Sequence, residues 1–102
     1  MNLTALLTRD SFTLKRRGGA DSEGNPLSAL TIVGTYKGTW GSPSSRDVLA
    51  ASREDQVVEA VIAGVFPARV GDHLIGLRGA NWIVIMIRPL VTHNRYFLRE
   101  AE

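Results

Sequence analysis

The sequence predicts a mainly β fold, a small antiparallel β-barrel or sandwich of about six strands with one short helix and a long early loop. The chain has 102 residues, of which 44% are hydrophobic, and this is the size and composition of one compact domain spanning residues 1–102. Most apolar segments follow the two-residue period of strands. Turn-forming Gly, Pro, Asn and Asp separate these segments, as in small all-β domains.

The strands follow from this alternation and from the turns that bound it. Residues 11–15 alternate polar and apolar side chains, as a half-buried strand does. Pro67 lacks a backbone donor and should end the strand before it. The Gly-containing segment 78–81 joins two apolar runs, which together predict a hairpin. The expected strands cover residues 11–15, 30–36, 57–66, 73–77, 82–87 and 95–99.

One short helix is expected after the second strand. Ser44 or Ser45 can cap its first turn, and Asp47 would lie near the positive end of the helix dipole. Residues 48–51 are helix-compatible and apolar, and the charged residues 53–55 follow them. The pattern predicts a helix of two or three turns.

Residues 16–29 form the long early loop of this prediction. They carry no periodic apolar pattern and are rich in turn-forming residues. A connection of this length is uncommon in so small a domain and is usually functional or disordered. Gly18, Gly19 and Gly24 would let the segment change its path. We therefore expect a flexible loop with a role of its own.

Composition excludes several classes of protein. The chain has no Cys, which excludes a disulfide scaffold and a thiolate metal cluster. Its longest apolar run, residues 82–87, is far shorter than the roughly 20 residues that span a bilayer, and residues 1–10 lack the basic start of a secretory signal. We expect no membrane contact and a cytoplasmic place of synthesis. Twelve Lys and Arg against ten Asp and Glu give a net charge of +2, too small to indicate nucleic-acid binding alone.

No catalytic or cofactor motif stands out. The Gly-rich loop lacks the Gly-Lys-Ser/Thr ending of a phosphate-binding loop, and no serine lies in a Gly-x-Ser-x-Gly turn. His73 and His93 do not have metal-ligand spacing. Glu54 and Asp55 are neighbours in sequence, so their side chains should not face a common substrate. We predict that the chain is not an enzyme and holds no cofactor and no metal.

The strand at residues 82–87 is apolar on both faces. Trp82, Val84 and Met86 should share one face of the strand. The opposite face should carry Ile83, Ile85 and Ile87. A strand of this kind is buried on both sides, so we expect one face in the core and part of the other under the helix or a neighbouring subunit. Aromatic residues often anchor such contacts. The candidate interface residues are Trp40, Trp82, Ile85 and Met86.

The order of features resembles a known family. The features run from an early strand that ends in basic residues to an Asp-x-x-Gly-Asn loop (residues 21–25), a strand followed by Gly38 to Ser45, and a short helix. A Gly71-Asp72 turn, a Gly79-x-x-Trp82-x-Val84 hairpin and a closing strand complete the order. Across residues 11–99 this resembles the head-to-tail stopper (head closure, or head–tail joining) proteins of long-tailed bacteriophages.

The resemblance implies a structural protein of the phage neck that acts in the virion and assembles in the host cytoplasm. Its subunits would form a homo-oligomeric ring with portal or adaptor proteins above it and a tail terminator or tail tube below it. The ring would close the channel over packaged double-stranded DNA and give the tail its attachment surface. The implied channel-loop residues are Arg16, Arg17, Gly18, Gly19, Asp21, Gly24 and Asn25.

Lys15, Arg16 and Arg17 at the base of the loop would be repeated around such a ring, where they could face DNA phosphates. Two alternatives remain open. The chain could be an adaptor or tail-terminator ring subunit of the same particle, or it could be a small β-barrel nucleic-acid-binding module.

Overall fold

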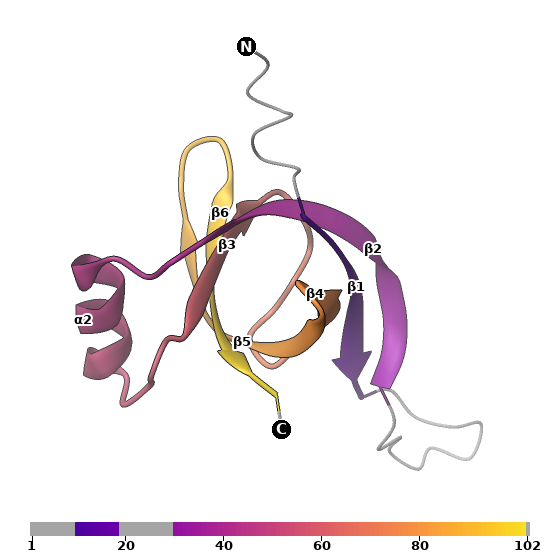
Figure 1. The fold of residues 1–102 in the computed structure, drawn as a ribbon, viewed down its shortest axis with the longest axis horizontal. Helices are drawn as coiled ribbons and strands as arrows, with labels where there is room; N and C mark the ends of the chain where they lie inside the picture. The colour runs from indigo at the N-terminus through magenta and orange to yellow at the C-terminus, as the bar shows by residue number, and fades with distance from the viewer. Residues whose placement is uncertain (1–9, 19–29, 102) are drawn as a thin grey trace.

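A computed structural model describes residues 10–18 and 30–101, and within them the expected mainly β architecture is confirmed. Six antiparallel strands close into a barrel in the order β1-β2-β3-β6-β5-β4, and β4 pairs back onto β1 (Figure 1). The elements are β1 (Asp10–Arg17), β2 (Leu30–Gly41), α2 (Ser45–Arg53), β3 (Ala60–Gly64), β4 (His73–Leu77), β5 (Ala80–Pro89) and β6 (Asn94–Glu100). None of the described helical residues forms a helix long and apolar enough to cross a membrane.

Strand β1 is longer than predicted, and this corrects the start of the early loop. Arg16 and Arg17 belong to β1, where they pair with Thr31 and Leu30 of β2. The hydroxyl of Thr31 also donates a hydrogen bond of 3.0 Å to the carbonyl oxygen of Arg16. Backbone pairing therefore continues to Arg17, although polar side chains at these positions gave no strand pattern.

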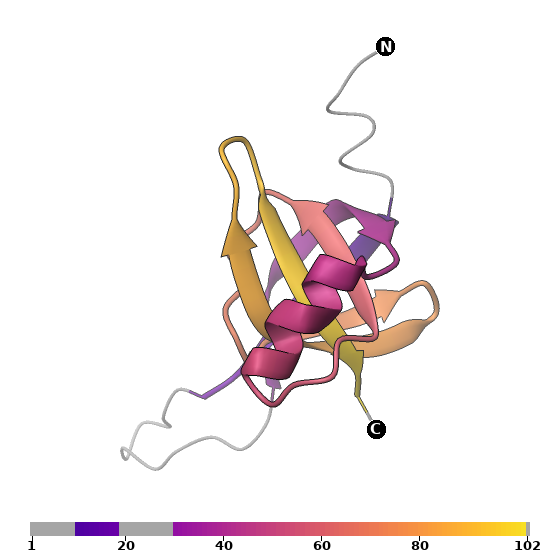
Figure 2. The same ribbon diagram turned by 90° about the vertical axis from the view of Figure 1, so that its left-hand side faces the viewer.

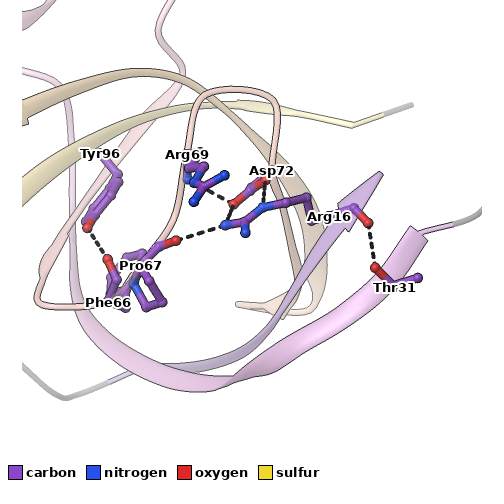
Figure 3. A network of polar contacts seen from close by, with 7 residues as sticks. All are labelled: Arg16, Thr31, Phe66, Pro67, Arg69, Asp72 and Tyr96. Atoms are coloured by element: carbon purple, nitrogen blue, oxygen red, sulfur yellow. Dashed lines mark hydrogen bonds and ion pairs between the residues drawn. The ribbon is translucent and has the colours of Figure 1, made fainter. Parts of the chain in front are cut away.

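The interior of the barrel holds the main core. Alternate strand residues, among them Phe12, Leu14 and Leu74, point inward and are almost fully buried. The connection between β3 and β4 adds Phe66, whose ring stacks on Tyr96 with centroids 4.2 Å apart. The hydroxyl of Tyr96 donates to the carbonyl oxygen of Phe66, which gives this buried polar group a partner (Figure 3).

Helix α2 packs against the outside of the barrel (Figure 2). Ser44 and Asp47 form a capping box, since the side chain of each accepts a hydrogen bond from the backbone N–H of the other. The buried side of the helix carries Ala51, which lies in a second apolar cluster with residues of β3, β5 and β6. Small residues on this side allow the helix to approach the sheet closely.

Strand β5 departs from the predicted assignment of faces. Its pairing with β6 shifts between Val84 and Met86, so Ile85 is the extra residue of a β-bulge. Val84 and Ile87 consequently contact the barrel core, whereas Ile85 and Met86 lie in the cluster under α2. The prediction that Met86 shares a face with Val84 is wrong, because a bulge reverses the alternation beyond it. Helix α2 covers part of the outer face of β5. The sequence predicted that either the helix or a neighbouring subunit would cover this face.

Candidate functional site

The loop between β3 and β4 is tied to β1 by an ion pair between Arg16 and Asp72. The guanidinium donates from Nε to Oδ1 at 2.9 Å and from Nη2 to Oδ2 at 2.8 Å (Figure 3). Nη2 also donates to the carbonyl oxygen of Pro67 at 2.9 Å, and the backbone N–H of Arg69 donates to Asp72 Oδ2 at 2.9 Å. Asp72 is buried, and its hydrogen bond raises the pKa of Arg16 above the ordinary value.

Arg16 therefore does not belong to the loop in which it was predicted. Its side chain binds the β3–β4 connection from the end of β1, and only 29% of it is exposed. A bidentate pair of this geometry fixes both partners. Arg16 acts as a structural tie between two segments of the chain.

Lys15 lies on the opposite side of β1, in a row that crosses four strands of the barrel. It pairs with His73 of β4, His73 pairs with Ile83 of β5, and Ile83 pairs with Arg99 of β6. Residues directly opposite each other in a sheet point to the same side. Because the adjacent residue Leu14 is inside the barrel, this row lies on the outer surface.

Two arginines make the surroundings of His73 positive. Partial burial lowers the pKa of its imidazole first, and the charges of Arg17 and Arg99 lower it further, while the carboxylate of Asp72 acts in the opposite direction. Arg17 and Arg99 thus lie close enough to act on the same ring, although 82 positions separate them in the sequence.

An open cavity of about 370 Å³ lies beside this row. Its walls come from the end of β1 and from the turn before β4, and they include Arg17 and Arg69 together with the Arg16–Asp72 pair. Gly71 forms the tip of that turn with a φ of +94°, a conformation that favours glycine. We call the surface formed by Lys15, Arg17, Arg69, His73 and Arg99 the basic surface.

The basic surface is suited to electrostatic contact with an extended anion. Arginine and lysine side chains bind phosphate oxygens without reading a base sequence. The carboxylate that lines the cavity, Asp72, already binds Arg16. In the described part of the chain no group of three or more His, Asp or Glu residues could hold a metal ion.

A second open cavity of about 640 Å³ lies at the start of α2 and has a different composition. Arg46, Arg88 and Arg95 line it with Asp47. Arg95 donates to Asp47 at 2.6 Å from Nη2 and at 3.1 Å from Nε, so one of these arginines is engaged. The capping box already gives hydrogen-bond partners to backbone N–H groups at the start of the helix. We therefore assign no ligand to this cavity.

The predicted interface aromatics lie together at the edge of the core. The rings of Trp40 and Trp82 meet edge to face with centroids 4.9 Å apart, and Trp82 Nε1 donates to the carbonyl oxygen of Leu77 at 2.9 Å. The guanidinium of Arg78 lies 5.4 Å from the Trp40 ring. Both rings are half-buried and pack on the main core, so their role within the chain is structural.

Four of the predicted channel-loop residues, Gly19, Asp21, Gly24 and Asn25, lie outside the described residues. Gly18 is the last described residue before them. Its φ is +129°, a backbone conformation that residues with a side chain rarely adopt. Sequence reasoning missed Arg69, His73 and Arg99. Their shared surface depends on strand pairing around a closed barrel, for which the sequence carried no local signal.

Comparisons with protein-family models, with curated proteins and with solved structures found no match to this chain.

Proposed function

We propose that the chain is a head-to-tail stopper, a structural ring subunit in the neck of a long-tailed bacteriophage. One observation carries the proposal: the connection between β1 and β2 leaves and re-enters the barrel at Arg17 and Leu30, beside the basic surface. The two described ends of the segment that resembles a channel loop therefore lie beside the exposed cations. The function would be assembly and closure of the DNA channel, without catalysis.

Multiplicity explains how so few charges would retain DNA. A single subunit offers Arg17, Arg69 and Arg99 with Lys15 at the border, which is a small contact by the standard of a DNA-binding protein. In a ring these cations repeat around the channel, and linked weak contacts combine into a strong one. Phosphate contacts suit packaged double-stranded DNA of any sequence. The protein partners would be portal or adaptor proteins above the ring and the tail terminator or tail tube below it.

The experiment compares phage particles that carry variants of this chain. Arg17→Gln combined with Arg99→Gln removes two cations of the basic surface, and Arg88→Gln on β5 is the control at an exposed arginine outside it. We expect the double variant to be incorporated normally but to lose packaged DNA, and the control to retain it. Particle-bound protein and encapsidated DNA are measured on the same preparation. Particles that lack the chain yet keep DNA and attach tails would contradict the proposal.

A second candidate is a small barrel that binds single-stranded nucleic acid, which the basic surface favours, because Lys15 and Arg99 lie at the two ends of a row that crosses four strands. Such a module would bind oligonucleotides as a free subunit, with an affinity that falls steeply as salt rises. We expect the free chain to bind weakly or not at all at physiological ionic strength. Tight, salt-sensitive binding by the monomer would favour the module. An adaptor or tail-terminator ring would be recognised by its position in the neck of the particle.

A further inference from the structure

Helix α2 presents its larger apolar side chains to solvent. Val48 is 52% exposed and Leu49 is 55% exposed, whereas Asp47 and Ala51 face the barrel and are buried. A surface helix normally buries its large apolar residues and exposes its polar ones. Val57, which follows the helix in the chain, is also exposed, at 75%. We call the exposed surface of Val48, Leu49 and Val57 the α2 face.

Acidic residues flank this face at the C-terminal end of the helix. Glu54, Asp55 and Glu59 are all exposed. Arg53 lies in the last turn of α2, and the group remains acidic when its charge is included. The α2 face is therefore apolar along the helix and negative where the helix ends.

A complementary surface lies on the opposite side of the barrel. Ile32 of β2 is 69% exposed, and its direct partner across the strand pair is Lys15 of β1. Thr35 and Lys37 are exposed further along β2. We call the surface of Lys15, Ile32, Thr35 and Lys37 the β1–β2 face; it is apolar at Ile32 and positive at Lys15 and Lys37.

The two faces are placed so that identical subunits can join in series. Figure 1 shows α2 on one side of the barrel and β1 with the first half of β2 on the other, and Figure 2 shows α2 in front of them. In both views the C-terminal ends of α2 and β1 lie at the lower side of the barrel. A second copy placed alongside in the same orientation would bring the acidic end of one α2 towards Lys15 of the next subunit.

We infer that the α2 face of one subunit binds the β1–β2 face of a second copy of this chain. The choice of partner rests on the proposed ring function together with the charge complementarity of the two faces. Because different surfaces meet, the contact is heterologous, the type that generates rings. Val48 and Leu49 pack against Ile32, and Glu54 or Asp55 pairs with Lys15. This assigns Lys15 to the subunit contact and leaves Arg17, Arg69 and Arg99 to the channel.

The absence of Cys from the sequence allows a direct test by disulfide trapping. A mixture of Leu49→Cys and Ile32→Cys chains is oxidised gently, and cross-linked dimers are resolved on a non-reducing gel. We expect the mixed pair to cross-link several-fold faster than either variant alone. The double variant Ile32→Cys/Leu49→Cys should give a ladder of longer species, because each subunit then carries both halves of the contact.

The control mixture pairs Leu49→Cys with Val91→Cys, since Val91 is fully exposed in the connection between β5 and β6 and lies on neither face. Cross-linking of the test mixture no faster than this control would overturn the inference, as would dominant pairing of Leu49→Cys with itself. Glu54→Lys should slow the test reaction, and Lys15→Glu in the partner should restore it. These measurements use neither particles nor DNA. The proposed subunit contact can therefore be contradicted without contradicting the proposed neck function, and the reverse also holds.

Discussion

Asp47 connects two elements through one side chain. Its carboxylate caps the start of α2 by accepting from the backbone N–H of Ser44 at 2.8 Å, and it also binds the guanidinium of Arg95 on β6. The carboxylate is 1% exposed. The hydrogen bond from Arg95, helped by those from Ser44, outweighs burial and lowers the pKa of Asp47 from 3.8 to about 2.

This pKa predicts how stability changes in acid. The folded pKa lies below the unfolded one, so ionised Asp47 stabilises the fold above about pH 4, and this contribution is lost as pH falls through about 2. We expect Asp47→Asn to be less stable than the natural chain at neutral pH, with the difference shrinking in acid. Urea unfolding of both proteins across this range measures it. A difference in free energy that stays constant with pH would contradict the prediction.

Gly38 is a position where the barrel has no room for a side chain. A Cβ there would come within 2.7 Å of Ile62 Cγ1 and within 2.9 Å of the carbonyl oxygen of Ala63. We expect Gly38→Ala to lower the free energy of unfolding by about 1–3 kcal/mol, the usual cost of overpacking. Gly41 is the matched control in the same strand, because a Cβ there meets nothing within 4 Å. Equal thermal stability of the two alanine variants would show that the strands adjust.

At the scale of elements, α2 and the bulge in β5 depend on each other. Ile85 lies on the outer side of β5 and the bulge turns Met86 to the same side, where a bare barrel would expose both, and α2 packs on this cluster through Ala50 and Ala51. The large apolar residues of the helix make no comparable contribution to the monomer, because they point away from the barrel. The covered face of β5 therefore stabilises the monomer, whereas the exposed face of α2 contributes little to its stability.

These roles predict different outcomes for two truncations. Ile85→Ala removes a buried side chain beneath α2 and should cost about 2–4 kcal/mol. Leu49→Ala on the exposed side should change monomer stability by less than about 0.5 kcal/mol. Ile85→Asp should prevent stable folding, because it places a charge under the helix. Chemical denaturation of the purified variants compares them. A similar loss of stability in both alanine variants would mean that Leu49 packs on its own chain.

At the scale of the whole molecule, the barrel closes independently of the segment between β1 and β2. The two strands remain paired up to Arg17 and Leu30, and closure continues on the other side of β1 through β4. The entropy of closing a connection grows only logarithmically with its length. The fold is therefore expected to tolerate a shorter connection.

Replacing residues 18–28 with a short Gly-Ser turn tests this separation of fold and function. We expect the variant to keep the melting temperature of the natural chain and to be incorporated into particles, while filled heads lose their DNA. A thermal melt and an assay of encapsidated DNA are both needed. Full retention of DNA and infectivity would remove the channel role of the segment and leave the role of a ring subunit in place.

The local structure could be predicted from patterns within single segments of the chain. Alternating apolar residues, Pro67 and the Gly-containing turns predicted the six strands, although β2 continues five residues beyond the predicted end at Tyr36, and Ser44 with Asp47 predicted the helix. These features depend on neighbours in the chain, whose periodicity and backbone preferences can be read directly. The strand ends were less certain, as Arg16 and Arg17 show, because pairing with β2 extends β1 beyond its apolar pattern.

The contacts between distant residues depend on how the barrel closes. Arg16 binds Asp72, and Arg17 and Arg99 act on the same His73, because closure of the barrel brings β1 next to β4 and the strand register aligns β4 with β6 through β5. The bulge at Ile85 arises in the same way, from pairing between strands rather than from the apolar pattern of one. Such contacts are set by register and closure, which join residues far apart in the sequence and leave no periodic signal within either segment.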